Sequence, residues 1–225
     1  MNLGVILVAG GTGSRMQSAI PKQYLPLAQK PIAQHSLELF LQIPKVKELV
    51  IVCAEEYRTL FPDHTLFADP GERRQDSVWN GLQRLSRSID FVCIHDAARP
   101  LITLPLIEQL LKEAEETGAA TLAMPLKFTV KRSDANAFVE ETPPRSTLWE
   151  IQTPQCLKKA WLEEGFTHAN QHNLTATDDV GLIEPLGYPV KLVQGCYSNL
   201  KITTPEDLVL AEHLWNNRNT PTSFS

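Results

Sequence analysis

Glycines and basic residues gather near the start of the chain in a pattern that suits phosphate binding. The run Ala9-Gly10-Gly11-Thr12-Gly13-Ser14-Arg15-Met16 is followed shortly by Pro21-Lys22-Gln23. Glycines let backbone N–H groups approach a ligand closely, and Arg15 and Lys22 add positive charge, as a polyphosphate requires. A Walker A loop would need Gly-Lys-Ser/Thr, and a dinucleotide fingerprint would need glycine where Met16 stands. Taken alone, the loop fits a tight turn with surface cations equally well.

Further motifs with polar side chains follow along the chain. They are Gly71-Glu72-Arg73-Arg74-Gln75-Asp76-Ser77-Val78, His95-Asp96-Ala97-Ala98-Arg99-Pro100, Thr153-Pro154-Gln155, Thr177-Asp178-Asp179 and Asn199-Leu200-Lys201-Ile202-Thr203. Ser77 could contact a ligand or enter a helix, and Asp178 could contact a ligand or cap a helix through Ile183. Asp96 follows an apolar strand, so its carboxylate could contact hydroxyl groups, orient a divalent ion, or pair with Arg99.

The elements that must position these residues alternate between short apolar runs and longer amphipathic ones. Strands are expected at Leu3–Ala9, Glu48–Ala54, Asp90–His95, Ala119–Leu126 and Pro189–Gln194. Helices are expected at Pro31–Gln42, Arg73–Ser86, Pro105–Glu116, Leu157–Gln171 and Pro205–Trp215. This alternation predicts an α/β fold with a Rossmann-like, mostly parallel sheet flanked by helices. The binding crevice of such a sheet lies beyond the carboxyl ends of its strands, where the motifs fall.

One stretch departs from this alternation. Lys127–Arg145 has β-branched residues around Ser133-Asp134-Ala135-Asn136 and then Pro143-Pro144, which predicts a protruding β-hairpin arm. A two-stranded arm is marginal alone and gains stability by packing on a partner. We therefore expect one domain over residues 1–225, with residues 127–145 as an arm for dimerisation.

Composition excludes several classes of function. The chain has 225 residues and a net charge of −5, which argues against a broad basic surface for nucleic acid or anionic lipid. Its apolar runs are too short to span a membrane, and a strand-like run begins at Leu3 without a targeting segment, so we expect a cytoplasmic protein. The cysteines (Cys53, Cys93, Cys156 and Cys196) are widely spaced without a CxxC, which favours plain thiols.

Taken together and in this order, the motifs resemble those of the 2-C-methyl-D-erythritol 4-phosphate cytidylyltransferase family of the non-mevalonate isoprenoid pathway. The resemblance covers nearly the whole chain. It implies transfer of CMP from CTP to 2-C-methyl-D-erythritol 4-phosphate with release of pyrophosphate, with Mg²⁺ as cofactor. It also implies a homodimer in which the arm reaches the neighbour's active site.

The resemblance assigns residues to roles. Arg15 and Lys22 would stabilise the transition state, and Arg145 and Lys201 would position the acceptor phosphate. The expected CTP contacts are Ala9, Gly10, Gly11, Thr12, Gly13, Ser14, Arg15, Lys22, Gly71, Glu72, Ser77, Asp96 and Lys201. The expected acceptor contacts are Asp96, Thr129, Arg145, Thr153 and Lys201, and Asp96 is the candidate metal ligand beside an ion held mainly by CTP phosphates. Where the family has Asp-Thr at the start of the hairpin, this chain has Phe128-Thr129, so one hydrogen-bonding carboxylate is lost.

The chemistry explains why cations outnumber bases in this set. A phosphate monoester has a second pKa of about 6, so the nucleophile is already ionised near neutrality. The difficulty is to hold two polyanions in line while charge develops, which is a task of positioning and cationic stabilisation.

Alternative functions remain at this point. Ribitol 5-phosphate cytidylyltransferases share the glycine loop and the HDAxRP and TPQ motifs, so the acceptor stays open. A glycosyltransferase would require an Asp-x-Asp metal site after a central strand, and this chain has Asp96-Ala97-Ala98 there. A non-catalytic nucleotide-binding regulator would not need the set Arg15, Lys22, Arg145 and Lys201.

Overall fold

The computed structural model describes residues 1–11, 16, 18, 20–63 and 65–218 of the chain. Thr12, Gly13, Ser14 and Arg15, which belong to the expected CTP set, therefore lie outside the described residues.

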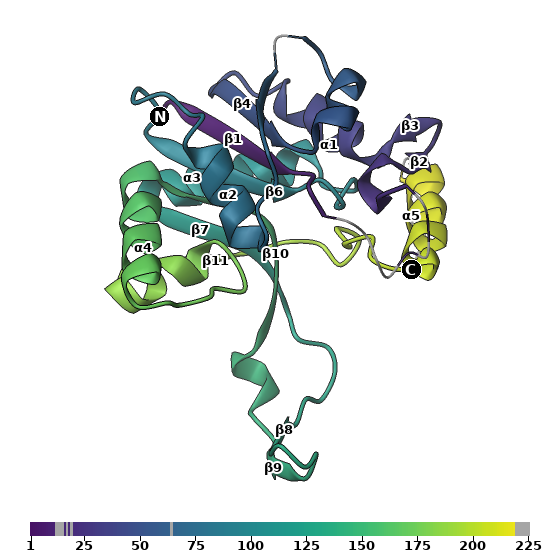
Figure 1. Cartoon of the computed structure of the whole chain (residues 1–225). Coiled ribbons are helices and arrows are strands. Elements are labelled where there is room, and N and C mark those ends of the chain that lie inside the picture. Colours follow the sequence, from purple (N-terminus) through teal and green to yellow (C-terminus); the bar gives the residue numbers. More distant parts are fainter. Residues whose placement is uncertain (12–15, 17, 19, 64, 219–225) are drawn as a thin grey trace.

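A seven-stranded sheet forms the centre of the molecule (Figure 1). Its strands are β1 (Leu3–Val8), β4 (Val46–Val52), β5 (Leu66–Ala68), β6 (Phe91–Asp96), β7 (Ala119–Pro125), β10 (Trp149–Lys158) and β11 (Lys191–Gln194), in the spatial order β11-β7-β10-β6-β1-β4-β5. β1 pairs in parallel with β4 and β6, β4 with β5, and β7 with β11, whereas β10 runs antiparallel to both of its neighbours. The predicted mostly parallel α/β sheet is confirmed.

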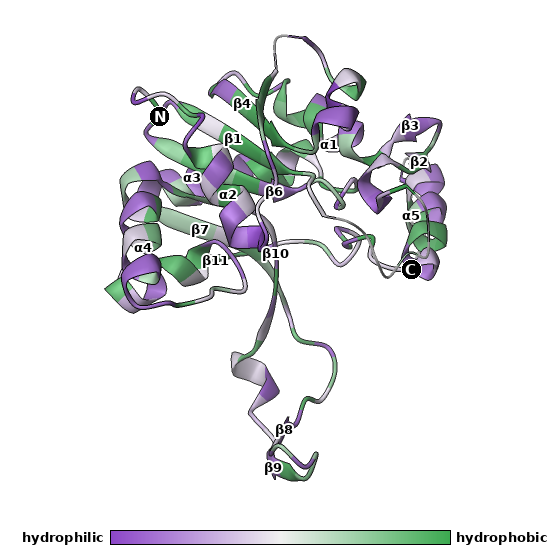
Figure 2. Ribbon diagram, in the orientation of Figure 1, coloured by the Kyte–Doolittle hydropathy of each residue, from purple (hydrophilic) through white to green (hydrophobic). Residues whose placement is uncertain are grey.

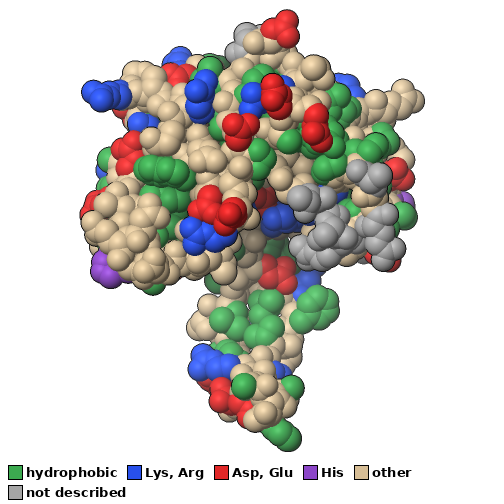
Figure 3. All heavy atoms as spheres, in the orientation of Figure 1, with side chains coloured by type: hydrophobic (Ala, Val, Ile, Leu, Met, Phe, Trp, Pro, Cys, Tyr) green, Lys and Arg blue, Asp and Glu red, His purple; other side chains and the backbone are tan. Residues whose placement is uncertain are grey.

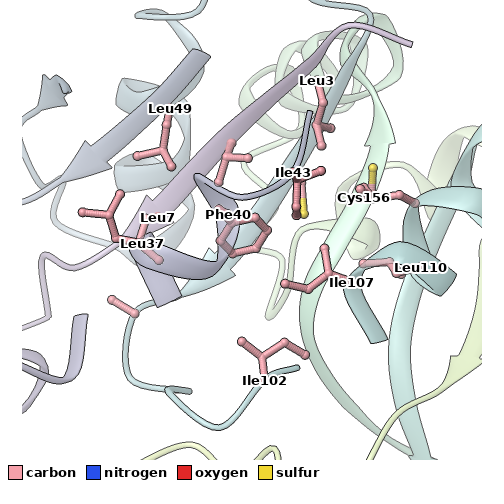
Figure 4. Close-up of a cluster of buried hydrophobic side chains, with 14 of the residues drawn as sticks. Leu3, Leu7, Leu37, Phe40, Ile43, Leu49, Ile102, Ile107, Leu110 and Cys156 are labelled. Atoms are coloured by element: carbon pink, nitrogen blue, oxygen red, sulfur yellow. The ribbon is translucent and has the colours of Figure 1, made fainter. Parts of the chain in front are cut away.

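Helices cover both faces of this sheet. They are α1 (Ile32–Phe40), α2 (Arg74–Leu82), α3 (Leu104–Thr117) and α4 (Lys159–Gln171), followed by α5 (Pro205–Asn217) at the side. In Figure 4, Phe40 of α1 lies among buried side chains that include Leu7 and Ile107, so α1 and α3 share one face. Val78 of α2 and Phe166 of α4 pack with the opposite face. Figure 2 shows the corresponding apolar colour along the central strands, which explains why those runs lack alternation.

α5 packs away from the sheet, on a short ribbon of two strands. These strands are β2 (Pro26–Leu27) and β3 (Lys30–Pro31), which pair antiparallel. Leu27, Ile32, Ile202 and Ala211 form a small buried cluster that joins the ribbon, α1 and α5. The chain just before α5 is thereby anchored beside the first loop. No helix among the described residues has the length and apolar character needed to cross a bilayer.

Two strands of the sheet, β5 and β10, were not predicted from the sequence. The helix expected at Leu157–Gln171 begins only at Lys159, because Leu157 and Lys158 continue β10. The proline of Thr153-Pro154-Gln155 interrupts the strand pattern in the sequence. In the structure the register with β7 shifts between Ile151 and Gln155, so Pro154 sits where a ladder hydrogen bond is not required. The Thr153–Pro154 peptide bond is cis.

The hairpin arm is present and projects from the body between β7 and β10 (Figure 1). Its tip consists of β8 (Arg132–Ser133) paired antiparallel with β9 (Val139–Glu141). Several large apolar side chains of the arm are exposed: Phe128 by 74%, Phe138 by 72% and Val139 by 61%. Figure 3 shows apolar side chains over much of the arm's visible surface. Solvent exposure of this extent marks a surface suited to a protein partner.

Candidate active site

Two adjoining cavities open beyond the carboxyl ends of β1 and β6. The first, of about 320 Å³, is lined by Val8, Gly10, Gly11, Lys22, Gln23, Gly71, Glu72, Arg73, Arg74, Ser77, Asp96, Ala98 and Lys201. The second, of about 420 Å³, is lined by Arg74, Asp96, Arg99, Ile151, Gln152, Thr153, Gln155, Thr177, Asp178, Glu184 and Lys201. Arg74, Asp96 and Lys201 therefore contribute to both. The structure brings together most described members of the expected nucleotide set at the first cavity, and Asp96, Thr153 and Lys201 of the acceptor set at the second.

The beginning of the glycine loop is held in place by hydrogen bonds that its carbonyl groups accept. Nε2 of the buried Gln23 donates to the carbonyl oxygens of Ala9 at 2.6 Å and of Gly11 at 2.8 Å, and the Tyr24 hydroxyl donates to Ala9 at 2.7 Å. Ala9 is buried and supports the loop from behind, whereas a Cβ at Gly11 would meet nothing within 4 Å. The backbone at Gly11 is thus open to a ligand. Gln23 also fixes the position of its neighbour Lys22 at the cavity.

Gly10 and Gly71 are required by close packing between loops. A Cβ at Gly10 would lie 2.6 Å from the Cβ of Pro70, and one at Gly71 would collide with Asp76. The Ser77 hydroxyl accepts a hydrogen bond from the Gly71 N–H at 3.0 Å and donates to the Arg73 carbonyl at 3.3 Å. Ser77 therefore serves as a helix-entry residue that shapes the loop, and it lines the nucleotide cavity at the same time.

Asp96 stands among cations at the junction of the two cavities. Its Oδ2 lies 2.8 Å from Nζ of Lys201 and 3.8 Å from Nε of Arg99, and its Oδ1 accepts from Nε of Arg74 at 3.0 Å. Burial would raise the pKa of this carboxyl, but the charges of Arg74 and Lys201 outweigh burial and hold the pKa well below its usual range. Asp96 is therefore ionised throughout the physiological range and orients Lys201. The ion pair between Asp96 and Arg99, which the sequence allowed, is present, but it is longer than the pairs of Asp96 with Lys201 and Arg74.

Sequence reasoning missed the role of Arg74. Its two terminal nitrogens donate to Oδ1 and Oδ2 of Asp179 at 2.8 Å each, so one guanidinium joins Asp96 to Asp179. The side chain of Asp179 is 1% exposed, and burial raises the pKa of its carboxyl while Arg74 opposes that shift. The two carboxylates in turn raise the pKa of Arg74 against the effect of burial. The sequence shows an arginine, Arg74, at a helix start and the pair Asp178-Asp179. The two lie far apart in the chain, so no sequence motif indicates that they form an ion pair.

The Thr-Pro-Gln motif holds this network from β10. The Thr153 hydroxyl accepts from the Asp96 N–H at 3.0 Å. Gln155 Oε1 accepts from the N–H groups of Asp179 at 2.8 Å and Val180 at 3.0 Å, and its Nε2 donates to Asp178 Oδ2 at 2.9 Å. Two strand residues thus position three carboxylates.

The position of Asp178 bears on both roles that the sequence left open for it. Its Oδ1 accepts from the N–H of Gly181 at 3.1 Å, at the beginning of the short helical turn Val180–Leu182. This contact resembles that of a capping side chain, but the N-cap residue of the turn is Asp179, not Asp178 as the capping interpretation had it. Asp178 also lines the acceptor cavity, so a contact with a ligand remains available to it.

The arm residues of the expected site lie elsewhere in the chain. Arg145 is exposed, and one terminal nitrogen of its guanidinium donates to the carbonyl of Lys127 at 2.8 Å. It lines a separate cavity of about 610 Å³ with Pro125, Leu126, Lys127, Ser146 and Trp149. Thr129 is likewise exposed in the arm. The structure therefore does not bring Arg145 or Thr129 to the cavities of their own chain.

The described residues do not form a dedicated metal site. No group of three or more His, Cys, Asp or Glu side chains within them could hold a metal ion. Asp96, the candidate ligand, has one oxygen on Arg74 and the other on Lys201, so its lone pairs are largely used by cations. This donor set matches an ion bound mainly through nucleotide phosphates rather than a protein-built cage.

Geometry and charge define the class of protein. A mostly parallel α/β sheet carries a glycine loop, a nucleotide-sized cavity and an adjoining second cavity whose shared wall presents Lys201 and Arg74, as a nucleotidyltransferase requires. The family model of 2-C-methyl-D-erythritol 4-phosphate cytidylyltransferase (IspD) matches residues 3–217. The chain belongs to this family.

Individual relatives agree with this assignment. The chloroplastic 2-C-methyl-D-erythritol 4-phosphate cytidylyltransferase of Oryza sativa is 45% identical, over 96% of this chain and 75% of the relative. The protein of that name from Chlamydia pneumoniae is 43% identical, over 93% of this chain and 97% of the relative. Among solved structures, the enzyme of that name from Thermus thermophilus has a TM-score of 0.81 at 31% identity, with 96% of this chain and 100% of that chain covered.

His95 gives a prediction about stability against pH. The carbonyl of Arg99 can only accept, so Nε2 of His95, 3.2 Å away, carries the proton, and Nδ1 accepts from the Thr153 hydroxyl at 3.1 Å. Burial lowers the pKa of His95 to about 3. Below a pH of about 6.5 the unfolded chain binds a proton at this residue that the folded chain does not, so stability falls as pH falls. Between pH 7.5 and 5.5 this residue alone removes about 1 kcal/mol.

Urea unfolding of the wild type and of His95→Gln at the two pH values measures this contribution. We expect the variant to lose that part of the pH dependence, whereas the exposed control His172→Gln keeps it. An unchanged pH dependence in His95→Gln would show that the buried ring is not held neutral.

Proposed function

We propose that the protein transfers CMP from CTP to 2-C-methyl-D-erythritol 4-phosphate and releases pyrophosphate. The observation that carries this proposal is the pair of adjoining cavities that share Arg74, Asp96 and Lys201. A cation in the shared wall can contact phosphates from both sides. The names of the relatives from Oryza sativa and Chlamydia pneumoniae support the nucleotide and the acceptor.

In this proposal the first cavity binds CTP and the second binds the acceptor. In the first, the open backbone at Gly11 and the ammonium of Lys22 face the triphosphate, and the backbone of Gly71 and Glu72 faces the base. In the second, the acceptor phosphate approaches Lys201, which is 37% exposed and turned toward Asp96. A phosphate oxygen of the acceptor attacks the α-phosphorus of CTP and forms a new P–O bond. The bond between the α-phosphorus and the oxygen that bridges to the β-phosphorus breaks, and pyrophosphate leaves with that electron pair. No base is needed, because the attacking phosphate is already ionised.

We also propose that Mg²⁺ enters the site bound to the nucleotide. Bound to the triphosphate, it would neutralise part of the negative charge on the phosphate oxygens. Asp96 is the nearest candidate ligand from the protein, and its pairs with Arg74 and Lys201 limit it to a secondary role. A cytoplasmic location is also proposed, because CTP and polyol phosphates carry charges that a bilayer excludes.

The homodimer completes the proposal. The exposed Phe128, Phe138 and Val139 give the arm an apolar surface that a second copy of the chain would cover. In that arrangement Arg145 and Thr129 would reach the neighbour's acceptor cavity, and Arg145 would meet the acceptor phosphate. Neither residue lines the two cavities of its own chain, which supports this role.

A mixing experiment tests whether sites are shared between subunits. Lys22→Ala and Arg145→Gln chains, each inactive alone, are expected to regain about a quarter of wild-type activity when they are mixed and refolded. Half of the dimers are then heterodimers, and each heterodimer contains one site with both residues intact. Pyrophosphate release measures the recovery, and native mass spectrometry counts the heterodimers. Heterodimers without activity would show that each site is built from one chain.

The acceptor is tested by pyrophosphate release with CTP and Mg²⁺, comparing methylerythritol 4-phosphate with ribitol 5-phosphate. We expect turnover with the first acceptor and little with the second. The reverse preference would make the protein a ribitol phosphate cytidylyltransferase. Nucleotide binding without release from either acceptor would support a regulator, and both outcomes would reject the proposed substrate.

A further inference from the structure

A further cavity, of about 680 Å³, lies on the far side of the active-site loops. It is enclosed by α1, α5 and the segment that leads from Arg99 to α3. Apolar side chains dominate its wall, among them Leu39, Leu101, Leu214 and Trp215. Cavities of about 300–1,000 Å³ with this character are typical small-molecule sites. Neither the nucleotide nor the acceptor cavity shares any lining residue with it.

An aromatic and cationic group marks one part of this wall. The rings of Trp215 and His35 lie 4.1 Å apart, and the guanidinium carbon of Arg218 lies 3.5 Å from the centre of the Trp215 ring. Within the described part of the chain, no carboxylate forms an ion pair with Arg218. Glu38, the acid of this wall, is already paired with Lys30 at 2.6 Å. The charge left for a ligand is therefore positive.

We propose that this cavity binds a small aromatic anion, a flat apolar ring system that carries one acidic group. The ring would lie among Leu39, Leu214 and Trp215, and the acid would meet the guanidinium of Arg218. A neutral apolar ligand would leave the guanidinium without an anionic partner. A polyanion would gain nothing further from the apolar wall.

The cavity is coupled to the active site through its back wall. Pro100 and Ser198 line the cavity, and each is adjacent in sequence to a residue of the active-site network. Arg99 donates to the carbonyl of Asn199 at 2.8 Å, and the Ile202 N–H donates to the Ala98 carbonyl at 2.8 Å. The segments that carry Asp96 and Lys201 are thus bonded together, with this cavity behind them. An occupant that shifts either segment changes the affinity for the nucleotide, and this second step rests on the proposed function.

Fluorescence of 8-anilinonaphthalene-1-sulfonate, an aromatic anion, measures binding to the folded chain. Against the wild type, we expect Arg218→Gln to weaken binding by about tenfold, the loss of one charge-assisted contact. Leu214→Trp, which extends a half-buried side chain into the cavity, is expected to abolish binding. Arg87→Gln removes an exposed arginine that does not line the cavity and serves as the matched control with unchanged binding. Circular dichroism confirms that each variant is folded.

The outcomes separate the site from its coupling. Equal binding by the wild type, Arg218→Gln and Leu214→Trp would place the probe elsewhere and overturn the proposal. Saturating CTP should change the probe's Kd, and the probe should change the Kd of CTP by the same factor. Probe binding that depends on Arg218 but is indifferent to bound CTP would keep the site and overturn the coupling. A chain that binds the probe at this cavity but does not bind CTP would contradict the proposed function instead.

Discussion

Replacing Lys22 with Ala is expected to lower kcat for pyrophosphate release by about 10²–10³-fold, while KM for CTP changes little. Lys22 begins a single helical turn, Lys22–Tyr24, and lines the nucleotide cavity. Its neighbour Gln23 is bonded to the carbonyls of Ala9 and Gly11, so the backbone at Lys22 cannot move away from the loop. A cation held in this way acts most strongly where negative charge increases during the reaction, which is at the α-phosphoryl oxygens.

Steady-state kinetics with varied CTP separate this effect from simple binding. Lys22→Arg should retain part of the activity, because it keeps the charge but not the position. Lys47→Ala, at an exposed lysine whose Nζ donates to the carbonyl of Pro44, should match the wild type. A raised KM with an unchanged kcat would reassign Lys22 to binding in the ground state.

The second large effect concerns stability. Arg74→Gln is expected to lower the free energy of unfolding by about 3–5 kcal/mol, because Asp179, at 1% exposure, then keeps a buried charge without its partner. The adjacent Arg73 provides a matched control. Its pair with Asp76 is exposed, with side-chain exposures of 48% and 33%, so Arg73→Gln should lower the free energy of unfolding far less than Arg74→Gln does.

Urea unfolding of the two single variants measures this contrast between neighbouring arginines. A double variant, Arg74→Gln with Asp179→Asn, should recover much of the loss, because the buried charge is removed with its partner. Equal losses in Arg73→Gln and Arg74→Gln would show that the pair with Asp179 contributes nothing special. In folded Arg74→Gln, kcat should also fall, because Asp96 loses the contact that orients it toward Lys201.

The sequence was sufficient to predict the site residues that lie at or just beyond the ends of strands. Asp96 ends β6, and Gly11 and Lys201 lie in loops. Their places follow from the β/α alternation, so their convergence was predictable. Arg74, Asp179 and Gln155 were not assigned, because their roles depend on contacts between segments that are remote in the chain. Such pairings leave no local pattern.

Further features of the site and the fold could not be predicted from the sequence, each for its own physical reason. Thr153 was expected to touch the acceptor, and it does line the second cavity. The sequence did not show that its hydroxyl is also bonded to the Asp96 N–H and to His95, because that follows from the pairing of β10 with β6. Strand β10 itself was missed because Pro154 breaks the apolar pattern, and sequence alone does not show that the ladder shifts at that point. The role proposed for Arg145 requires a second chain, since its cavity is separate from those of Lys22 and Lys201.

The place of β10 also matters for the order of events during synthesis. β6 and β7 have no direct pairing, and β10 fills the position between them only after the whole arm has been made. Until then, a nascent chain has two unpaired strand edges in the middle of its future sheet, and such edges invite aggregation. The N-terminal half therefore cannot close its core on the ribosome by itself. Folding of the sheet is expected to wait for residues 149–158, and premature termination within the arm should yield an insoluble product.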